Sequence, residues 1–241
     1  MQILSITFPF SLHPGQIPAF RAAIAEAVGF DQELFHQHNN SNPAQGALKR
    51  DYPKIQYSVR RGKAAITGLG EGAEAIREHL LVQQPEWIEM GGQAYATAGL
   101  QVQESSLELR INKAPDIYGL ASWMALNSEN YQEWKLQQAD ETERLRILSR
   151  ALTGQLRAMG ETLGLADFKK LDGKVLKVDR QKKVYWHQTE LIVFDAVVQL
   201  NVDLPSGIGL GRAAAFGYGE VKSFLEYAKY RQTRMLVNAL V

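Results

Sequence analysis

The stretch FHQHNN, residues 35–40, places two histidines, His36 and His38, one residue apart. A histidine has a reference pKa of about 6.5, so it holds or releases a proton close to neutral pH. In an extended segment, side chains at i and i+2 point the same way about 6.5–7 Å apart, a span that can flank one phosphate. The pair therefore fits general acid–base chemistry, in which one group removes a proton and another supplies one.

Two other interpretations of the pair remain open at this point. His-x-His also provides two ligands of a metal site, and the third ligand would then come from Asp31, Glu33 or His187. Histidines in a polar surface loop also occur with no function at all. The elements around the pair, and the charges along the chain, have to favour one of the three interpretations.

Composition excludes several classes of protein. The 241 residues are 45% hydrophobic and 22% charged, which is ordinary for a globular protein and provides enough apolar material for a core. There is no cysteine, which excludes disulfides, thiolate metal sites and cysteine nucleophiles and fits a reducing compartment. No apolar run approaches the roughly 18–20 residues that span a bilayer, and residues 1–15 lack the features of a signal peptide. We expect a cytoplasmic protein without a membrane partner.

The net charge of +1 conceals a strong segregation of charge along the chain. Residues 49–63 and 169–183 are rich in Lys and Arg, whereas residues 71–109 hold seven Glu and a single Arg. Basic segments favour a polyanionic partner such as a nucleic acid. On charge alone, solvated hairpin faces explain them equally well.

Hydrophobic periodicity predicts strands alternating with helices. In the first half we expect a strand at 3–8, a helix at 15–28, a polar loop at 29–52, strands at 52–59 and 63–69, a helix at 71–83, and strands near 87–91, 94–103 and 105–113. In the second half we expect a strand at 118–125, helices at 128–138 and 141–163, two long strands separated by a turn at DRQKK (179–183), a glycine-rich loop at 204–221 and a helical tail from Ser223. This order predicts an α+β fold of two ferredoxin-like βαββαβ units in tandem, residues 1–115 and 116–241.

The glycine-rich stretch contains Gly209-x-Gly211-x-x-Ala214, which superficially matches a dinucleotide-binding fingerprint. That fingerprint requires a preceding strand, a following helix and an acidic residue inside a βαβ unit, and here the chain continues with more glycine and a strand. We therefore expect no nucleotide cofactor. The loop instead offers backbone N–H groups beside Arg212, on a surface that can approach a phosphate closely.

These segments together resemble the CRISPR-associated endoribonucleases that cut precursor CRISPR RNA, in the b-type subgroup of the repeat-associated mysterious protein (RAMP) superfamily. GIGLGRAAAFGYG resembles the superfamily's glycine-rich loop. YPKIQYSVRRGKAAITGLGEGAEAI resembles the subgroup's paired strands and following helix, and LNSENYQEW and RILSRALTGQLRAMGETLG resemble its two central helices. FHQHNN lies where the subgroup carries two active-site histidines. The resemblance covers nearly the whole chain.

The resemblance implies a metal-independent endoribonuclease without a cofactor, in which His36 and His38 are the catalytic residues. The 2′-OH of the RNA would attack the phosphate, leaving a 2′,3′-cyclic phosphate and a 5′-OH. Charge on the transition state could be stabilised by Lys49, Arg50 or Lys54. We expect the RNA to be held by the basic and glycine-rich segments, at Arg146, Arg150, Lys174, Lys177, Gly207, Gly209, Gly211 and Arg212.

The implied partner is the precursor CRISPR RNA, bound at its repeats. A homodimer and hand-over of the product to a CRISPR effector complex are further expectations from the resemblance. The alternative function is a catalytically inactive RNA-binding subunit of such a complex, built from the same units. The histidine pair argues against that alternative, because a binding subunit needs no titratable pair in a loop. A metal-dependent hydrolase is the third hypothesis, and a chelator would abolish its activity.

Overall fold

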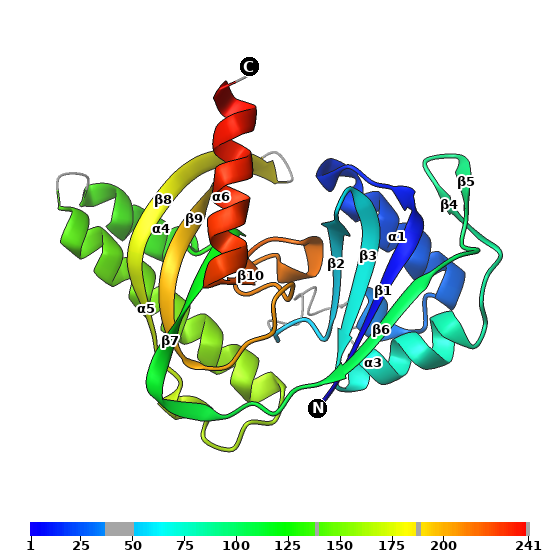
Figure 1. Cartoon of the computed structure of the whole chain (residues 1–241), viewed down its shortest axis with the longest axis horizontal. Helices are drawn as coiled ribbons and strands as arrows, with labels where there is room; N and C mark the ends of the chain where they lie inside the picture. Colours follow the sequence, from blue (N-terminus) through cyan, green and yellow to red (C-terminus); the bar gives the residue numbers. More distant parts are fainter. Residues whose placement is uncertain (37–50, 138–139, 187–188, 240–241) are drawn as a thin grey trace. The chain divides into compact units, whose positions relative to one another are not determined.

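The computed structural model describes residues 1–36, 51–137, 140–186 and 189–239 (Figure 1). The chain folds as two compact units. Unit 1 consists of Met1–Glu108 together with Ala215–Gly217, and unit 2 consists of Leu109–Ala214 and Tyr218–Val241. The expected boundary at 115/116 falls within a single strand of unit 2, β7 (Ile111–Trp123).

Unit 1 is a four-stranded antiparallel sheet with helices against it (Figure 1). Its strands have the order β2-β3-β1-β6, and a separate hairpin is formed by β4 and β5. The elements are β1 (Gln2–Ser11), α1 (Ile17–Val28), α2 (Glu33–His36), β2 (Ile55–Arg60), β3 (Lys63–Leu69), α3 (Glu71–Ile76), β4 (Trp87–Met90), β5 (Gln93–Ala96) and β6 (Gln101–Ser106). A 3-10 turn at Pro14–Gln16 leads into α1, and α3 continues as a π-helical turn at Arg77–Leu81.

The core of unit 1 forms where α1 packs on the sheet. Ile17, Phe20, Ile24 and Val28 recur at three- and four-residue spacing, so they share one face of α1, and all are buried. Phe20 lies edge-on to Tyr57 of β2, with ring centroids 5.7 Å apart. Tyr57 is completely buried, which places it in the core.

Unit 2 is also a four-stranded antiparallel sheet, ordered β10-β7-β9-β8. Its elements are β7, α4 (Ser128–Leu136), α5 (Glu141–Thr162), β8 (Gly173–Trp186), β9 (Thr189–Val202), β10 (Glu220–Ser223) and α6 (Phe224–Ala239), with a 3-10 turn at Phe168–Lys170. Another 3-10 turn, Ala214–Phe216, lies in the glycine-rich stretch. The buried face of α5 packs against β8, where a Cβ added to Gly173 would lie 2.8 Å from Leu152 and from Leu156.

Both four-stranded sheets have the order 4-1-3-2 when the strands of each sheet are numbered along the chain, which is the ferredoxin-like arrangement. The predicted α+β class is therefore confirmed. Unit 2 departs from βαββαβ at its second crossover, because the glycine-rich stretch connects β9 to β10 with only a 3-10 turn. No helix in the described part of the chain is long and apolar enough to cross a membrane.

The predicted turn at DRQKK is wrong. Residues 179–183 continue β8, which pairs with β9 as far as Trp186. β8 is the edge strand of its sheet, so charged side chains remain solvated there without ending the strand. Two register shifts, between Val175 and Lys177 and between Val178 and Arg180, bend this strand just before and at the start of the DRQKK segment.

Candidate active site

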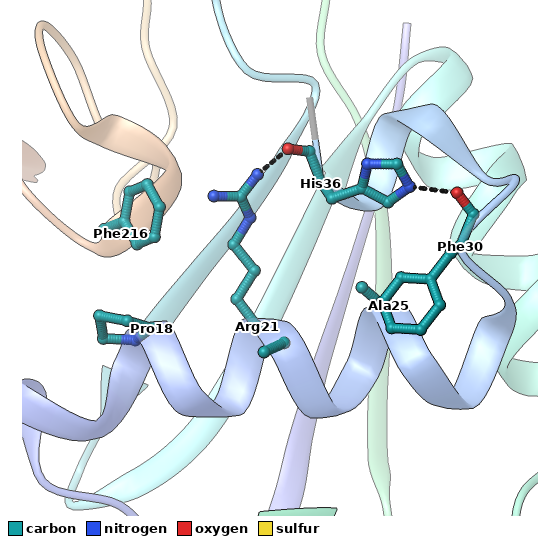
Figure 2. Close-up of a pocket in the computed structure, with 7 residues that line it drawn as sticks. Pro18, Arg21, Ala25, Phe30, His36 and Phe216 are labelled. Carbon is teal, nitrogen blue, oxygen red and sulfur yellow. Dashed lines mark hydrogen bonds between the residues drawn. The ribbon is translucent and has the colours of Figure 1, made fainter. Parts of the chain in front are cut away.

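His36 is the last residue of α2, and its ring is held by a backbone carbonyl. Its Nε2 lies 2.7 Å from the carbonyl oxygen of Phe30 (Figure 2). A carbonyl oxygen only accepts, so Nε2 must carry a hydrogen and donate it. In the neutral ring Nδ1 is then the nitrogen without a hydrogen.

Arg21 of α1 fixes the backbone on which His36 is carried. Its Nε donates to the carbonyl of Phe35 at 3.3 Å, and its guanidinium also donates to the carbonyl of His36 (Figure 2). The guanidinium carbon lies 4.6 Å from the ring centroid of Phe216, a cation–π contact. Burial lowers the pKa of Arg21 from its ordinary value, because desolvation disfavours the charged form.

Tyr57 supports the same short helix from the sheet. Its hydroxyl donates to the carbonyl of Phe35 at 3.0 Å, so this carbonyl accepts from both Tyr57 and Arg21. Burial raises the pKa of Tyr57 above its ordinary value, which keeps the phenol neutral and able to donate. The strand and the helix therefore hold α2 at one backbone position.

A pocket of about 330 Å³ lies beside His36. Figure 2 shows Arg21 rising from α1 between Phe216 on one side and Phe30 and His36 on the other. The wall is mostly apolar, with Arg21 and His36 as its polar side chains; the lining residues are Pro18, Arg21, Ala22, Ala25, Phe30, His36 and Phe216. Phe216 belongs to unit 1, so the glycine-rich stretch supplies one wall of this pocket.

The other residues predicted for catalysis are only partly placed. His38, Lys49 and Arg50 lie outside the described residues. Lys54 precedes β2, and its Nζ forms an ion pair with Glu71 at 2.6 Å. Lys54 would have to leave Glu71 before it could contact a phosphate.

A metal site finds no support among the described residues. In that part of the chain, no three His, Asp or Glu side chains are grouped closely enough to hold an ion. Asp31, one of the suggested third ligands, accepts a hydrogen bond from Gln32. His38 and His187 lie outside the described part, so the predicted pair itself is not covered by this observation.

The predicted RNA-binding cations all belong to unit 2. On α5, Arg146 donates to Glu143, and Arg150 pairs with Glu133 of α4. On β8, Lys177 pairs with Asp179 at 3.0 Å, while Lys174 is exposed. The Arg146 and Arg150 pairs join partly exposed groups that solvent screens, so RNA phosphates could displace them at small cost. The Asp179 side chain that pairs with Lys177 is only 4% exposed, so Lys177 is held by a buried carboxylate.

The two bulges of β8 bring its cations onto one face. Lys174 and Lys177 are three positions apart and would point to opposite faces of a regular strand. Because of the first bulge, they lie opposite Gln199 and Val197, which are two positions apart and share a face. The second bulge places Arg180 opposite Asp195, on that same face. Lys174, Lys177 and Arg180 therefore form one row, which we call the β8 row.

The glycine-rich stretch is closely packed against neighbouring backbone of the same chain. The amide of Gly207 donates to Val221 at 2.8 Å, and that of Arg212 donates to Met124 at 3.3 Å. Gly209 has no room for a side chain, because an added Cβ would lie 2.8 Å from the carbonyl oxygen of Tyr218. Gly211 has φ +96°, which favours glycine. The amides of Gly207 and Arg212 are therefore engaged within the protein, whereas the Arg212 side chain is exposed and could approach a phosphate.

Comparison with known proteins identifies the family. Residues 1–108 match the model of the Cas6b N-terminal domain, and residues 111–224 match that of the Cas6b C-terminal domain. The chain belongs to the Cas6b family. The predicted RAMP b-type resemblance is thus confirmed, over nearly the whole chain.

Solved structures extend the Cas6b comparison to the fold. A crystal structure of Cas6b has a TM-score of 0.79 at 22% identity, over 92% of this chain and 98% of the other. A CRISPR RNA processing endoribonuclease Cas6b has a TM-score of 0.67 at 22% identity, over 92% and 99%. An uncharacterized protein of Methanocaldococcus jannaschii is 28% identical over 102 residues, which are 42% of this chain and 67% of that protein.

Sequence reasoning missed three residues of the Cas6b chain's candidate site, namely Arg21, Phe30 and Phe216. Arg21 acts on backbone carbonyls, and Phe216 comes from a distant segment, so neither has a local sequence signature. Phe30 had a weak signal, since it follows Gly29 at the end of α1 and stands in an otherwise polar stretch.

Proposed function

We propose that the chain is a metal-independent endoribonuclease that cuts precursor CRISPR RNA within its repeats. Family membership supports the substrate class. The observation that supports acid–base chemistry is the hydrogen bond from His36 Nε2 to the Phe30 carbonyl. This bond orients the ring with Nε2 as the donor nitrogen, and in our proposal Nδ1 is the atom that exchanges a proton with the RNA. His38 is the second member of the acid–base pair.

In this mechanism one histidine removes the proton of a 2′-OH, and the 2′-oxygen attacks the adjacent phosphorus. As the 2′-O–P bond forms, the P–O5′ bond breaks, and the other histidine protonates the departing 5′-oxygen. The products are a 2′,3′-cyclic phosphate and a 5′-OH. Lys49, Arg50 and Lys54 are the candidates for stabilising the charge that develops on the phosphate.

The Arg21 and Tyr57 contacts support this assignment. A group that transfers protons must be held at a fixed place, and two hydrogen bonds from separate elements hold the peptide before His36. The β8 row, Arg146, Arg150 and Arg212 would hold the RNA backbone through charge, whatever its sequence.

The deciding experiment crosses two substrates with two buffers. One repeat RNA is all-ribose, and the other carries a single 2′-deoxy nucleotide immediately upstream of the cut. We expect the all-ribose RNA to be cut with and without EDTA, and the deoxy RNA to be cut in neither buffer. Analysis of the product ends should find the cyclic phosphate.

Each of the other hypotheses gives a different pattern. A metal-activated water attacks phosphorus without help from the sugar, so a metal-dependent hydrolase would cut the deoxy RNA and stop in EDTA. A catalytically inactive binding subunit would retain both RNAs and cut neither. Either pattern would overturn the proposed mechanism.

A further inference from the structure

The pocket beside His36 is lined by an aromatic ring, that of Phe30, which has no role in the proposed proton transfer. Phe30 presents its ring to solvent with 64% of its surface exposed, although the ring is large and apolar. The hydrogen bond from His36 Nε2 goes to the backbone carbonyl of Phe30, so the ring takes no part in it. Because Phe30 also lines the pocket, its exposed ring offers a flat apolar face to a ligand bound there.

The shape and chemistry of the pocket fit a flat aromatic heterocycle. At about 330 Å³ the volume is at the small end of the range for ligand pockets. The wall has an aromatic ring on each side, small alanine side chains from α1 and one cation, Arg21 (Figure 2). Proteins hold unstacked RNA bases in this way, between aromatic rings and guanidinium groups.

The position of the pocket indicates which base it would take. The ring centroids of Phe30 and His36 lie 6.5 Å apart, so a base on Phe30 would be next to the histidine. In the proposed reaction His36 acts at the scissile phosphate. The base in the pocket therefore belongs to a nucleotide that flanks this phosphate.

We propose that the pocket binds one nucleobase of the RNA, from a nucleotide adjacent to the cut, by stacking on the ring of Phe30. Stacking would turn this nucleotide out of the RNA helix or strand and hold the sugar–phosphate beside His36. This inference rests on the proposed endoribonuclease function. It adds a reason for cutting at one position, which the acid–base pair alone does not supply.

The test removes the ring and the base separately. Phe30→Ala keeps the backbone carbonyl that holds His36, and Phe30→Trp keeps an aromatic face. Trp87→Ala is the matched control, because Trp87 is 60% exposed and lies on β4, outside the pocket. Each protein is assayed on repeat RNA with all its bases, and on RNA made abasic at each nucleotide that flanks the cut.

Under single-turnover conditions, Phe30→Ala should slow cleavage of intact RNA about 5- to 150-fold, the usual effect of losing one stacked base. Phe30→Trp and Trp87→Ala should cut at nearly the rate of the unmodified protein. On the RNA that lacks the stacked base, Phe30→Ala should cause no further loss. Equal losses on intact and abasic RNA would show that the ring only packs protein, and would overturn the proposal.

Binding provides a readout that does not depend on cleavage. Deoxy RNA carrying 2-aminopurine at the identified nucleotide should lose fluorescence when it binds the unmodified protein, and retain it with Phe30→Ala. Unchanged fluorescence on binding to the unmodified protein would also overturn the proposal. If the deoxy RNA were cut, the proposed chemistry would fail, while the fluorescence would still decide whether the base stacks on Phe30.

Discussion

Replacing Arg21 with Met tests whether cleavage depends on the hydrogen bonds from Arg21 to the backbone of Phe35 and His36. Met retains an unbranched apolar stem, so the substitution removes the guanidinium and little packing. The carbonyls of Phe35 and His36 and the ring of Phe216 lose their contacts with the cation, and Tyr57 still donates to the Phe35 carbonyl. The damage should therefore be confined to α2 and the pocket.

The structure sets the size of the effect. A hydrogen bond to a charged group contributes about 1.5–3 kcal/mol, and a cation–π contact adds about 0.5–1 kcal/mol. Burial of Arg21 opposes these gains, since it lowers the arginine pKa, and Met carries no such penalty. We expect a net loss of roughly 1.5–2.5 kcal/mol in the docking of α2. If only docked α2 is active, cleavage slows by up to roughly 10- to 70-fold, the full factor applying when docking in the unmodified protein is marginal.

The assay is single-turnover cleavage at saturating RNA, with urea unfolding measured alongside. Arg157→Met is the matched control, because Arg157 donates its Nε to the Leu171 carbonyl at 3.0 Å in unit 2. Both variants should lose stability, and only Arg21→Met should lose rate. Equal rates for the two variants would refute the reasoning that Arg21 positions His36.

Three further predictions concern other residues of the chain. The amide of a glutamine can donate to the Phe30 carbonyl as His36 Nε2 does, so His36→Gln should be as stable as the unmodified protein. Its cleavage rate should fall about 10²–10⁴-fold, and a normal rate would exclude His36 from the chemistry. Reversing the charges of Lys174 and Arg180 should weaken RNA binding for every repeat sequence and flatten its salt dependence; an unchanged slope would place the RNA off the β8 row. Hydrogen bonds from Ser206 and Ser223 lower the pKa of Glu226, so its stabilisation is present above about pH 4.5 and is lost as the pH falls. Thermal unfolding between about pH 6 and 3 should thus be less pH-dependent for Glu226→Gln than for the unmodified protein, and identical curves would contradict this.

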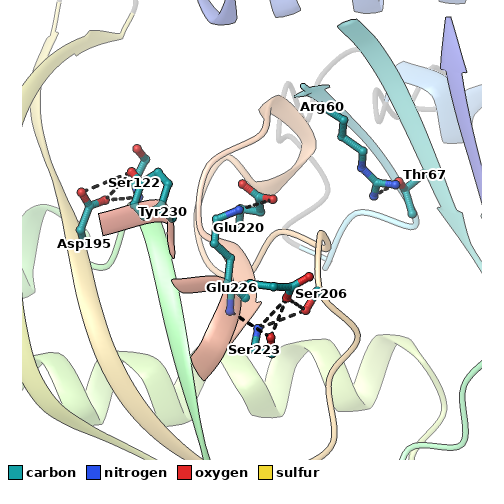
Figure 3. A network of polar contacts seen from close by, with 10 residues as sticks. Arg60, Thr67, Ser122, Asp195, Ser206, Glu220, Ser223, Glu226 and Tyr230 are labelled. Carbon is teal, nitrogen blue, oxygen red and sulfur yellow. Dashed lines mark hydrogen bonds and ion pairs between the residues drawn. The ribbon is translucent and has the colours of Figure 1, made fainter. Parts of the chain in front are cut away.

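The α6 contacts behind the last prediction are seen in Figure 3. Ser223 donates its amide and its hydroxyl to Glu226 Oε2, at 3.0 and 2.8 Å, and Ser206 donates to the same oxygen. One turn along α6, the hydroxyl of Tyr230 donates to Asp195 of β9. Burial, with a contribution from Asp195, raises the pKa of Tyr230 to about 12, so this tie persists to high pH.

The sequence predicted most of the elements because burial imposes a period on the residues of each. Residues 15–28 and 141–163 show the helical period, and the structure forms α1 and α5 there. Periodicity had no means of finding α2, since Glu33–His36 is a single turn. The prediction of a turn at DRQKK was wrong because charged residues are as common in an exposed edge strand as in a turn.

The candidate site was less accessible to sequence reasoning. His36 stood out because its residue type has few neutral-pH equivalents. Its partners did not, because Arg21 and Tyr57 recognise main-chain oxygens, which every residue possesses. The alignment of Lys174 with Arg180 depends on two bulges that only strand pairing defines.

The position of Phe216 late in the sequence means that unit 1 is completed late during synthesis of the chain. The ribosome completes residues 1–108 long before it reaches Ala215–Gly217, yet unit 1 includes both. At about 5–20 residues per second, several seconds separate these two events. During that interval the nascent chain carries His36 beside a pocket that lacks one wall. If cleavage needs the complete pocket, as our proposal implies, it would begin only after most of unit 2 has also been synthesised.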